Sequence, residues 1–542
     1  MKKSKFRVFV SVILFPFYLY GQSNGGEIKS ENLKDWYNAD PMTEKIQGVS
    51  VDKAYEYLKK KKSTKVIVAV IDSGVDIDHE DLQGQIWINE GEIAGNGIDD
   101  DKNGYVDDVY GWSFIGGKDG NVQQDTHELT REYVRLKNIY GEKEKKSIPK
   151  KNIEEYEYWK TVRDDFEGRI AEANKNATFY QGIHHNLIRF NEMLKNYLDV
   201  EKLSGADLQK VQSSDSIVFA AVGFLGNIAR IVGNDVDFDY VIEDLKGAVK
   251  YYTDQVEYTY NVNFDPRSIV GDNYDDLYER YYGNNDVKGP DPNHGTHVAG
   301  IIAAKRGNDL GIDGVASNVV IMPVRAVPDG DERDKDVANA IIYAVDNGAK
   351  IINMSFGKSY SPGKEAVDKA IKYAQSKGVL LVHAAGNSSK NTDKGKNYPS
   401  RRFNDNTEAS TWLEVGASSW GEGADFVGSF SNFGKKTVDL FAPGVQIYST
   451  TPNNEYESFD GTSMASPVTA GVAALLMSYY PDLSAAQIKE ILLSSTRKFD
   501  HLKVTKPGSE DEILFSDLSI TGGIVNAYEA VKMAESMKIE KN

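Results

Sequence analysis

The sequence predicts an α/β protein with a mostly parallel central sheet, interrupted by an inserted bundle of helices. Four short runs are rich in β-branched residues and lack polar alternation, as in parallel strands that are covered on both faces. They are residues 65–71, 319–325, 350–354 and 379–383. Helical patterns separate the later runs, as in successive βαβ units. A long charged and aromatic segment with helical periodicity lies between the first run and the second.

That segment, residues 127–263, is expected to form an all-α insertion. Apolar residues recur in it at helical spacing: Trp159, Val162, Phe166 and Ile170, then Ile183, Leu187, Phe190, Leu194 and Leu198. These stripes are typical of a helix core. Neighbouring helical residues do not face the same way, so His184 and His185 are not expected to form a metal pair. The insertion divides the α/β domain into residues 22–126 and 264–542.

The first 21 residues have the pattern of an export signal. Basic residues up to Arg7 precede an apolar run from Val8 to Tyr20, which is short for a membrane span. Removal of residues 1–21 predicts a periplasmic or extracellular protein without stable membrane association, and an uncleaved anchor is the alternative. Because the chain has no cysteine, no disulfide can stabilise it after export.

The composition limits the partners of the protein. The 542 residues carry a formal net charge of -18. An acidic surface argues against nucleic acid or an anionic membrane as a partner. The sequence does not determine the oligomeric state.

An acidic loop follows the first predicted strand. Asp99, Asp101, Asn103 and Gly104 match the opening half of an EF-hand calcium loop, but Tyr110 stands where the closing glutamate would be. Asp107 or Asp108 could complete the ligand shell in another geometry. The hypothesis is a structural calcium ion, and the alternative is a solvated acidic turn.

Three motifs carry an acid, a base and a hydroxyl in the order Asp72, His294, Ser463. They read Ile71-Asp72-Ser73-Gly74, His294-Gly295-Thr296-His297-Val298-Ala299-Gly300 and Gly461-Thr462-Ser463-Met464-Ala465-Ser466-Pro467. A serine hydroxyl becomes a useful nucleophile when an imidazole takes its proton and a carboxylate orients that imidazole. The order and the motifs resemble those of the subtilisin-like serine proteases, the subtilases. This resemblance implies a three-layer subtilisin-like fold.

The resemblance also implies the roles of the residues. Ser463 would attack, His294 would act as general base and then acid, and Asp72 would orient His294. His297 and His79 are expected to be structural. Asn387, which follows a buried strand, matches the asparagine that donates to the oxyanion, with the Ser463 backbone N–H as second donor; the alternative is a turn asparagine.

A helix is predicted from about Met464 to Tyr480, with Pro467 in its first turn. Ser463 would precede it, so that the positive helix N-terminus lies at the oxyanion.

The substrate pocket is expected between two strand ends. Ser355, Phe356 and Gly357 resemble one wall of the family's S1 pocket, and Ala385 and Gly386 belong to the opposite wall, Ala384 to Asn387. The expected pocket is mainly apolar, and nothing in the sequence singles out an acidic residue to select lysine or arginine. His383 replaces a small residue of the family pattern; it is interpreted as a buried, hydrogen-bonded histidine, with an effect on the pocket as the alternative.

The sequence therefore predicts an exported serine endopeptidase that hydrolyses peptides or proteins through an acyl-enzyme. Only residues 22 to about 52 separate the signal from the core, which is short for a folding propeptide. A catalytically silent binding or scaffold protein on the same fold is the main alternative. An esterase with the same triad is a second.

Overall fold

The structure is a computed structural model that describes residues 34–539 of the chain. The expected signal segment, residues 1–21, lies outside the described residues. The described chain falls into two compact units. An α/β unit contains residues 34–128 and 265–539, and a helical unit contains residues 129–264.

The main sheet of the α/β unit has nine strands in the order β12-β15-β9-β8-β7-β6-β1-β5-β2. All neighbouring strands are parallel except β12 and β15. The strands are β1 (Val66–Asp72), β2 (Trp112–Ser113), β5 (Val319–Arg325), β6 (Ile351–Met354), β7 (Leu380–Ala384), β8 (Trp412–Ser418), β9 (Leu440–Pro443), β12 (Arg497–Lys498) and β15 (Gly523–Ile524). The predicted parallel sheet is confirmed, and the four predicted runs are β1, β5, β6 and β7.

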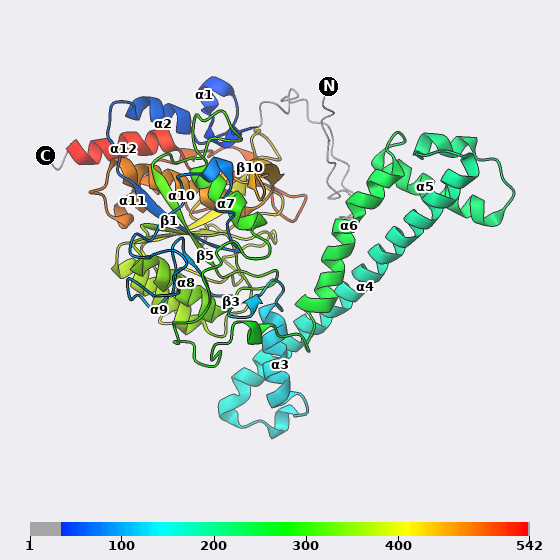
Figure 1. Ribbon diagram of the computed structural model, residues 1–542, viewed down its shortest axis with the longest axis horizontal. Helices are drawn as coiled ribbons and strands as arrows, with labels where there is room; N and C mark the ends of the chain where they lie inside the picture. The colour runs from blue at the N-terminus through cyan, green and yellow to red at the C-terminus, as the bar shows by residue number, and fades with distance from the viewer. Residues whose placement is uncertain (1–33, 540–542) are drawn as a thin grey trace. The chain divides into compact units, whose positions relative to one another are not determined.

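Helices cover both faces of the sheet, which gives the expected three layers (Figure 1). Side chains of β1 alternate between two hydrophobic cores: Val68 and Val70 enter one core, and Ala69 and Ile71 enter the other. The first core is shared with α2 (Val51–Leu58), α7 (Asn293–Ala303), α10 (Thr462–Tyr479), α11 (Ala485–Ser494) and α12 (Ala527–Ile539). The second is shared with α8 (Asp334–Asp346) and α9 (Lys364–Ser376).

Short elements complete the α/β unit. Three hairpins are formed by β3 (Gly116–Gly117) with β4 (Gly120–Asn121), β10 (Ile447–Thr451) with β11 (Glu455–Phe459), and β13 (Lys503–Thr505) with β14 (Glu512–Leu514). The short helices are η3 (Trp36–Asn38), α1 (Pro41–Glu44), η4 (Glu80–Leu82), η9 (Arg267–Ile269) and η10 (Phe515–Asp517).

The helical unit is built on one long helix, α4 (Ile153–Leu198, 46 residues). Both predicted apolar stripes lie on α4, where Trp159, Phe166, Leu187 and Leu194 are buried. The other helices are α3 (Glu128–Tyr140), η5 (Lys145–Ser147), η6 (Lys150–Asn152), η7 (Gly205–Lys210), α5 (Ser216–Val232), α6 (Phe238–Asp254) and η8 (Gln255–Thr259). Residues 129–264, all of them described, contain no strand. Throughout residues 34–539, no helix has the length and apolar character that crossing a membrane requires.

Candidate active site

Asp72 and His294 form the first pair of the site. Asp72 is the last residue of β1, and His294 lies in the first turn of α7. The His294 Nδ1–H donates to Asp72 Oδ1 at 2.7 Å, and the Ser73 backbone N–H donates to the same oxygen at 2.8 Å. The Asp72 side chain is 2% exposed, whereas the His294 side chain is 39% exposed. The pair therefore holds a buried carboxylate behind an imidazole that solvent can reach.

Glycines allow β1 and α7 to approach this closely. A Cβ atom on Gly295 would lie 2.1 Å from the Gly74 carbonyl oxygen and 3.1 Å from the Cβ atom of Asp72. Gly74 itself has φ +136°, a conformation that side chains disfavour. A larger residue at position 295 would push the helix away from the strand end and lengthen the bond between His294 and Asp72.

The electrostatics of the pair favour a charged imidazole. Burial lowers the pKa of His294, but the Asp72 carboxylate opposes it through its charge and its hydrogen bond, and Asp291 adds to this effect. The net result is a pKa above the ordinary value. Such an imidazole holds a transferred proton more readily than one in water.

Ser463 occupies the first turn of α10, which begins at Thr462. The helix start predicted at about Met464 lies two residues after the observed start at Thr462. Pro467 consequently lies beyond the first turn. A residue at position 467 would normally donate its N–H to the carbonyl of residue 463, but proline has no N–H. The Ser355 hydroxyl donates to that Ser463 carbonyl at 2.8 Å instead. The proline thus frees an acceptor that joins the start of α10 to the end of β6.

The Ser463 hydroxyl donates to the Ser355 carbonyl oxygen at 3.0 Å. Ser463 and Ser355 are thereby joined by two hydrogen bonds. A proton transfer from Ser463 to His294 would require the hydroxyl to rotate away from this carbonyl, and catalytic hydrogen bonds are often not yet formed in ligand-free geometry.

Asn387 follows β7 and faces the start of α10. Its Oδ1 accepts hydrogen bonds from the backbone N–H and the hydroxyl of Thr462, at 2.9 and 2.8 Å. These two bonds leave the amide nitrogen Nδ2 as the group that can donate. A Cβ atom on Gly461 would lie 3.3 Å from Asn387 Nδ2 and 3.5 Å from the Ser463 backbone nitrogen. The two nitrogens therefore border the same small space at the helix N-terminus.

A cleft of about 310 Å³ lies against Asn387 and Ser463. It is lined by Ser355, Phe356, Gly357, Ala384, Gly386, Asn387, Thr462 and Ser463, and by four residues of the loop after β5: Val327, Gly330, Asp331 and Glu332. Ala385 is fully buried, and its carbonyl accepts from the Asn432 amide, so Ala384 lines the cleft in its place.

Asp331 and Glu332, which the sequence did not single out, also line this cleft. They lie in the loop after β5, and the same reasoning about strand ends would have found them.

The other histidines have structural contacts. His297 is fully buried; its Nε2–H donates to the Glu457 carbonyl at 3.0 Å, and its ring stacks on Phe459. His79 contacts the Glu455 carbonyl and accepts from the Asp81 N–H. His383 is buried, and its Nδ1 lies 3.1 Å from each carboxyl oxygen of Glu414.

The acidic loop brings three carboxylates together: oxygens of Glu92, Asp99 and Asp101 lie within 4.8 Å of one another. Glu92, at the other end of the loop, was missed in the sequence because it lies outside the EF-hand pattern. The Asn103 side chain donates to Asp101 and Asp108, at 3.2 and 3.0 Å, and its own oxygen accepts from the Tyr105 N–H.

Asp107 and Asp108 have other partners. The Asp107 carboxylate accepts the backbone N–H groups of Asn96 and Gly97. Asp108 accepts from the Tyr343 hydroxyl at 2.6 Å and from Asn89. Burial raises the pKa of Asp108 to about 6, although these hydrogen bonds lower it. The converging donors are therefore Glu92, Asp99 and Asp101.

Known proteins resemble much of this chain. The model of the subtilase family matches residues 63–513. The thermophilic serine proteinase of Bacillus sp. strain AK1 is 43% identical over 187 residues, which are 34% of this chain and 43% of that protein. Thermitase of Thermoactinomyces vulgaris is 37% identical over 240 residues, 44% of this chain and 75% of thermitase. A solved structure described as proteases from Pseudoalteromonas arctica is 31% identical with a TM-score of 0.38, covering 46% of this chain and 78% of that one.

The match to the family covers most of the chain, including Asp72, His294, Asn387 and Ser463. The chain belongs to the subtilase family of serine endopeptidases. The alignments with the Bacillus protein and with thermitase each cover less than half of this chain.

The buried His297 predicts a specific loss of stability in acid. Burial lowers the pKa of His297 from the ordinary 6.5 to about 3. The unfolded state therefore binds a proton that the folded state excludes, and stability falls as the pH drops below the ordinary value. Between about pH 6 and pH 4.5, the titration of His297 alone should lower the free energy of unfolding by roughly 2 kcal/mol. The free energy of unfolding can be measured with urea at several pH values in the presence of a serine-protease inhibitor. It should fall less steeply with decreasing pH for His297→Gln than for wild type. The exposed His501→Gln is the control, and equal slopes in all three proteins would refute the assignment.

Proposed function

We propose that the protein is an exported serine endopeptidase in which Asp72, His294 and Ser463 form the catalytic triad and Asn387 the oxyanion hole. The main support is the 2.7 Å bond between His294 and Asp72 at the end of β1, in a unit whose cleft also contains Ser463 and Asn387. The raised pKa of His294 suits a base that must hold the serine proton.

In the proposed reaction, Ser463 Oγ attacks the carbonyl carbon of the scissile peptide bond while His294 Nε2 accepts the hydroxyl proton. The C–N bond then breaks, and His294 gives that proton to the leaving amine. Water attacks the acyl-enzyme, passes a proton to His294, and releases the acid as Ser463 Oγ regains its proton. Asp72 holds the imidazole in the tautomer that presents Nε2 and stabilises its charged form.

The negative oxygen formed in each addition step would accept from Asn387 Nδ2 and from the Ser463 backbone N–H. Their position at the N-terminus of α10 adds favourable electrostatic potential. The two bonds from Thr462 fix the amide so that Nδ2 is presented without further reorganisation.

The complete set of groups favours an enzyme over a silent scaffold. The Ser355 and Ala384 edges of the cleft, at the ends of parallel strands, suit an extended peptide better than a small ester. Peptides and proteins are the proposed substrates. The basic and apolar start of the sequence supports export to the periplasm or beyond.

The acidic loop is the proposed site of a structural calcium ion. Carboxylate oxygens are the ligands that calcium prefers, and Glu92, Asp99 and Asp101 supply three that converge. Asn103 contacts Asp101 and so stabilises the loop. The ion would offset the mutual repulsion of these carboxylates and stabilise the folded state.

Labelling tests the nucleophile. An organophosphonate should modify Ser463 alone and stop peptide hydrolysis, because the proposed triad assigns His294 to this hydroxyl as its base. Ser463→Ala should lose nearly all activity. The residual rate of peptide hydrolysis should be on the order of 10³-fold above the rate in water, because the remaining groups still act; this magnitude is known from subtilisin. Ser388→Ala, which removes an exposed serine beside Asn387, should still be labelled. Mass-spectrometric labelling of any other serine would contradict the proposal.

Substitution of Asn387 tests the oxyanion hole. Asn387→Ala should lower kcat by about 10²-fold or more with little change in KM, as for an oxyanion donor of subtilisin. Thr462 is a positioning residue for this amide, so Thr462→Val should also lower kcat while Thr462→Ser restores it. Steady-state kinetics separate the constants. A change confined to KM would place Asn387 in ground-state binding instead.

Chelation tests the calcium site. If calcium binds the folded state preferentially, EGTA should lower the melting temperature of the wild type. Asp101→Asn should melt at a lower temperature with calcium present and respond little to EGTA. Activity at low temperature should survive chelation, since the ion is not part of the reaction. Identical melting curves for both proteins, with and without EGTA, would identify the loop as a solvated acidic turn.

A further inference from the structure

The loop between β5 and α8 contributes an acidic wall to the cleft. Val327, Gly330, Asp331 and Glu332 of this loop line the same cleft as Ser463 and Asn387. The reaction proposed above uses none of these four residues. The triad and the oxyanion hole therefore do not account for the acids of this wall.

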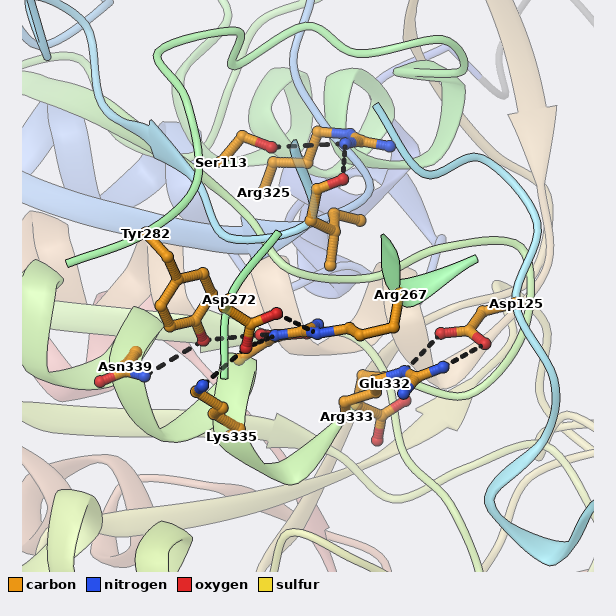
Figure 2. Close-up of polar contacts among 12 residues, drawn as sticks. Ser113, Asp125, Arg267, Asp272, Tyr282, Arg325, Glu332, Arg333, Lys335 and Asn339 are labelled. Carbon is orange, nitrogen blue, oxygen red and sulfur yellow. Dashed lines mark hydrogen bonds and ion pairs between the residues drawn. The ribbon is translucent and has the colours of Figure 1, made fainter. Parts of the chain in front are cut away.

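Glu332 is the unusual member of the wall. The residue is 2% exposed, and its carboxyl oxygen Oε1 is buried without a hydrogen-bond partner among the described residues. In Figure 2 no dashed line reaches the Glu332 carboxyl group. Burial raises the pKa of Glu332 to about 8, and the charge of Lys358 and the backbone N–H of Glu332 itself lower it only in part. A buried carboxyl group without a partner is costly, so the site favours a ligand that supplies a donor.

The nearby cations are bound to other carboxylates. Lys358 Nζ donates to Glu128 Oε2 at 2.7 Å and lies 2.9 Å from Asp334 Oδ1, and it donates to the backbone oxygen of Glu332. Arg333 donates to both carboxyl oxygens of Asp125, at 2.7 and 2.9 Å. None of these contacts of Lys358 and Arg333 reaches the Glu332 carboxyl group.

Unlike the Glu332 carboxyl group, the Asp331 carboxylate has partners. Its Oδ2 accepts from the Glu128 backbone N–H at 2.9 Å, and His127 Nε2 lies 3.7 Å from its Oδ1. A metal ion would require several converging oxygens, whereas Glu332 offers one unpartnered carboxyl group. The ligand that matches the Glu332 carboxyl group is a single positively charged side chain.

Ion pairs of the residues that follow Glu332 in the chain fix the backbone that carries it. Beyond the pair of Arg333 with Asp125, Arg267 donates to Asp272 and to Asp336 at the start of α8, in contacts of 2.6 to 2.8 Å (Figure 2). Lys335 donates to Asp272 and Glu279. Because these pairs are buried, the loop cannot move aside without leaving charges unpaired. The backbone that carries Glu332 is thus held in place before any substrate arrives.

We propose that Glu332 determines specificity by accepting a charge-assisted hydrogen bond from a lysine or arginine side chain of the substrate, on the N-terminal side of the scissile bond. This inference rests on the proposed function, because the walls that Glu332 joins are those expected to hold that part of the peptide. Arginine and lysine are the side chains whose fixed positive charge matches a buried carboxylate.

Peptides with a single lysine test the proposal. In a fluorogenic series, lysine is placed in turn at each of the four positions before the scissile bond, with norleucine as the uncharged counterpart. The ratio of kcat/KM for lysine over norleucine should be about tenfold or more at one position, the effect of one charge-assisted hydrogen bond. Glu332→Gln should abolish this ratio at that position, and Glu332→Asp should retain part of it.

Two controls separate the possible failures. Asp331→Asn changes the charge of the wall without removing the Glu332 carboxyl group, so the ratio should persist at the same position. Each variant is first titrated with the phosphonate, which counts folded and competent sites. Equal ratios in wild type and Glu332→Gln, with full titration of both, would overturn the proposal for Glu332. Failure of the wild type to react at Ser463 would instead overturn the proposed function.

Discussion

The burial of the central parallel sheet on both faces is the constraint on which the rest of this protein depends. Because both faces of β1, β6 and β7 are packed against helices, polar groups that must meet a substrate are confined to the ends of the strands. Asp72 ends β1, Ser355 follows β6 and Asn387 follows β7. Since these strands are parallel neighbours, their carboxyl ends lie at the same edge of the sheet, and so do the three residues.

The other two residues of the proposed triad come from helices whose starts are fixed against that edge. Gly295 allows α7 to approach the end of β1, which sets the short bond between His294 and Asp72. Pro467 leaves the Ser463 carbonyl free for the Ser355 hydroxyl, which joins α10 to β6. In both cases a residue is important for what it lacks, a Cβ atom or an N–H. Single substitutions at such positions are therefore expected to alter the site without touching a reacting atom.

Charge is distributed unevenly around the cleft. Around Ser463 the cleft presents hydrogen-bond donors and the positive end of α10, which would suit the developing negative charge of the proposed reaction. The wall formed by Asp331 and Glu332 presents acids. A substrate with a basic side chain placed before its scissile bond would satisfy both ends at once. The ion pairs of Arg333 and Arg267 keep the acidic wall in place, so the same residues that stabilise the loop also prepare it to bind.

The sequence by itself determined the parallel sheet, the helical character of residues 127–263, the family, and the residues proposed for the triad and the oxyanion hole. It could do so because strand periodicity and short motifs are local properties of the chain. It did not determine the helix start at Thr462, the presence of Glu92 beside Asp99 and Asp101, or the acidic wall. These depend on segments far apart in the chain that meet only when it folds. Whether Glu332 is paired or unpaired was likewise decided by the tertiary structure, because its possible partners, Lys358 and Arg333, are bound to carboxylates from other segments.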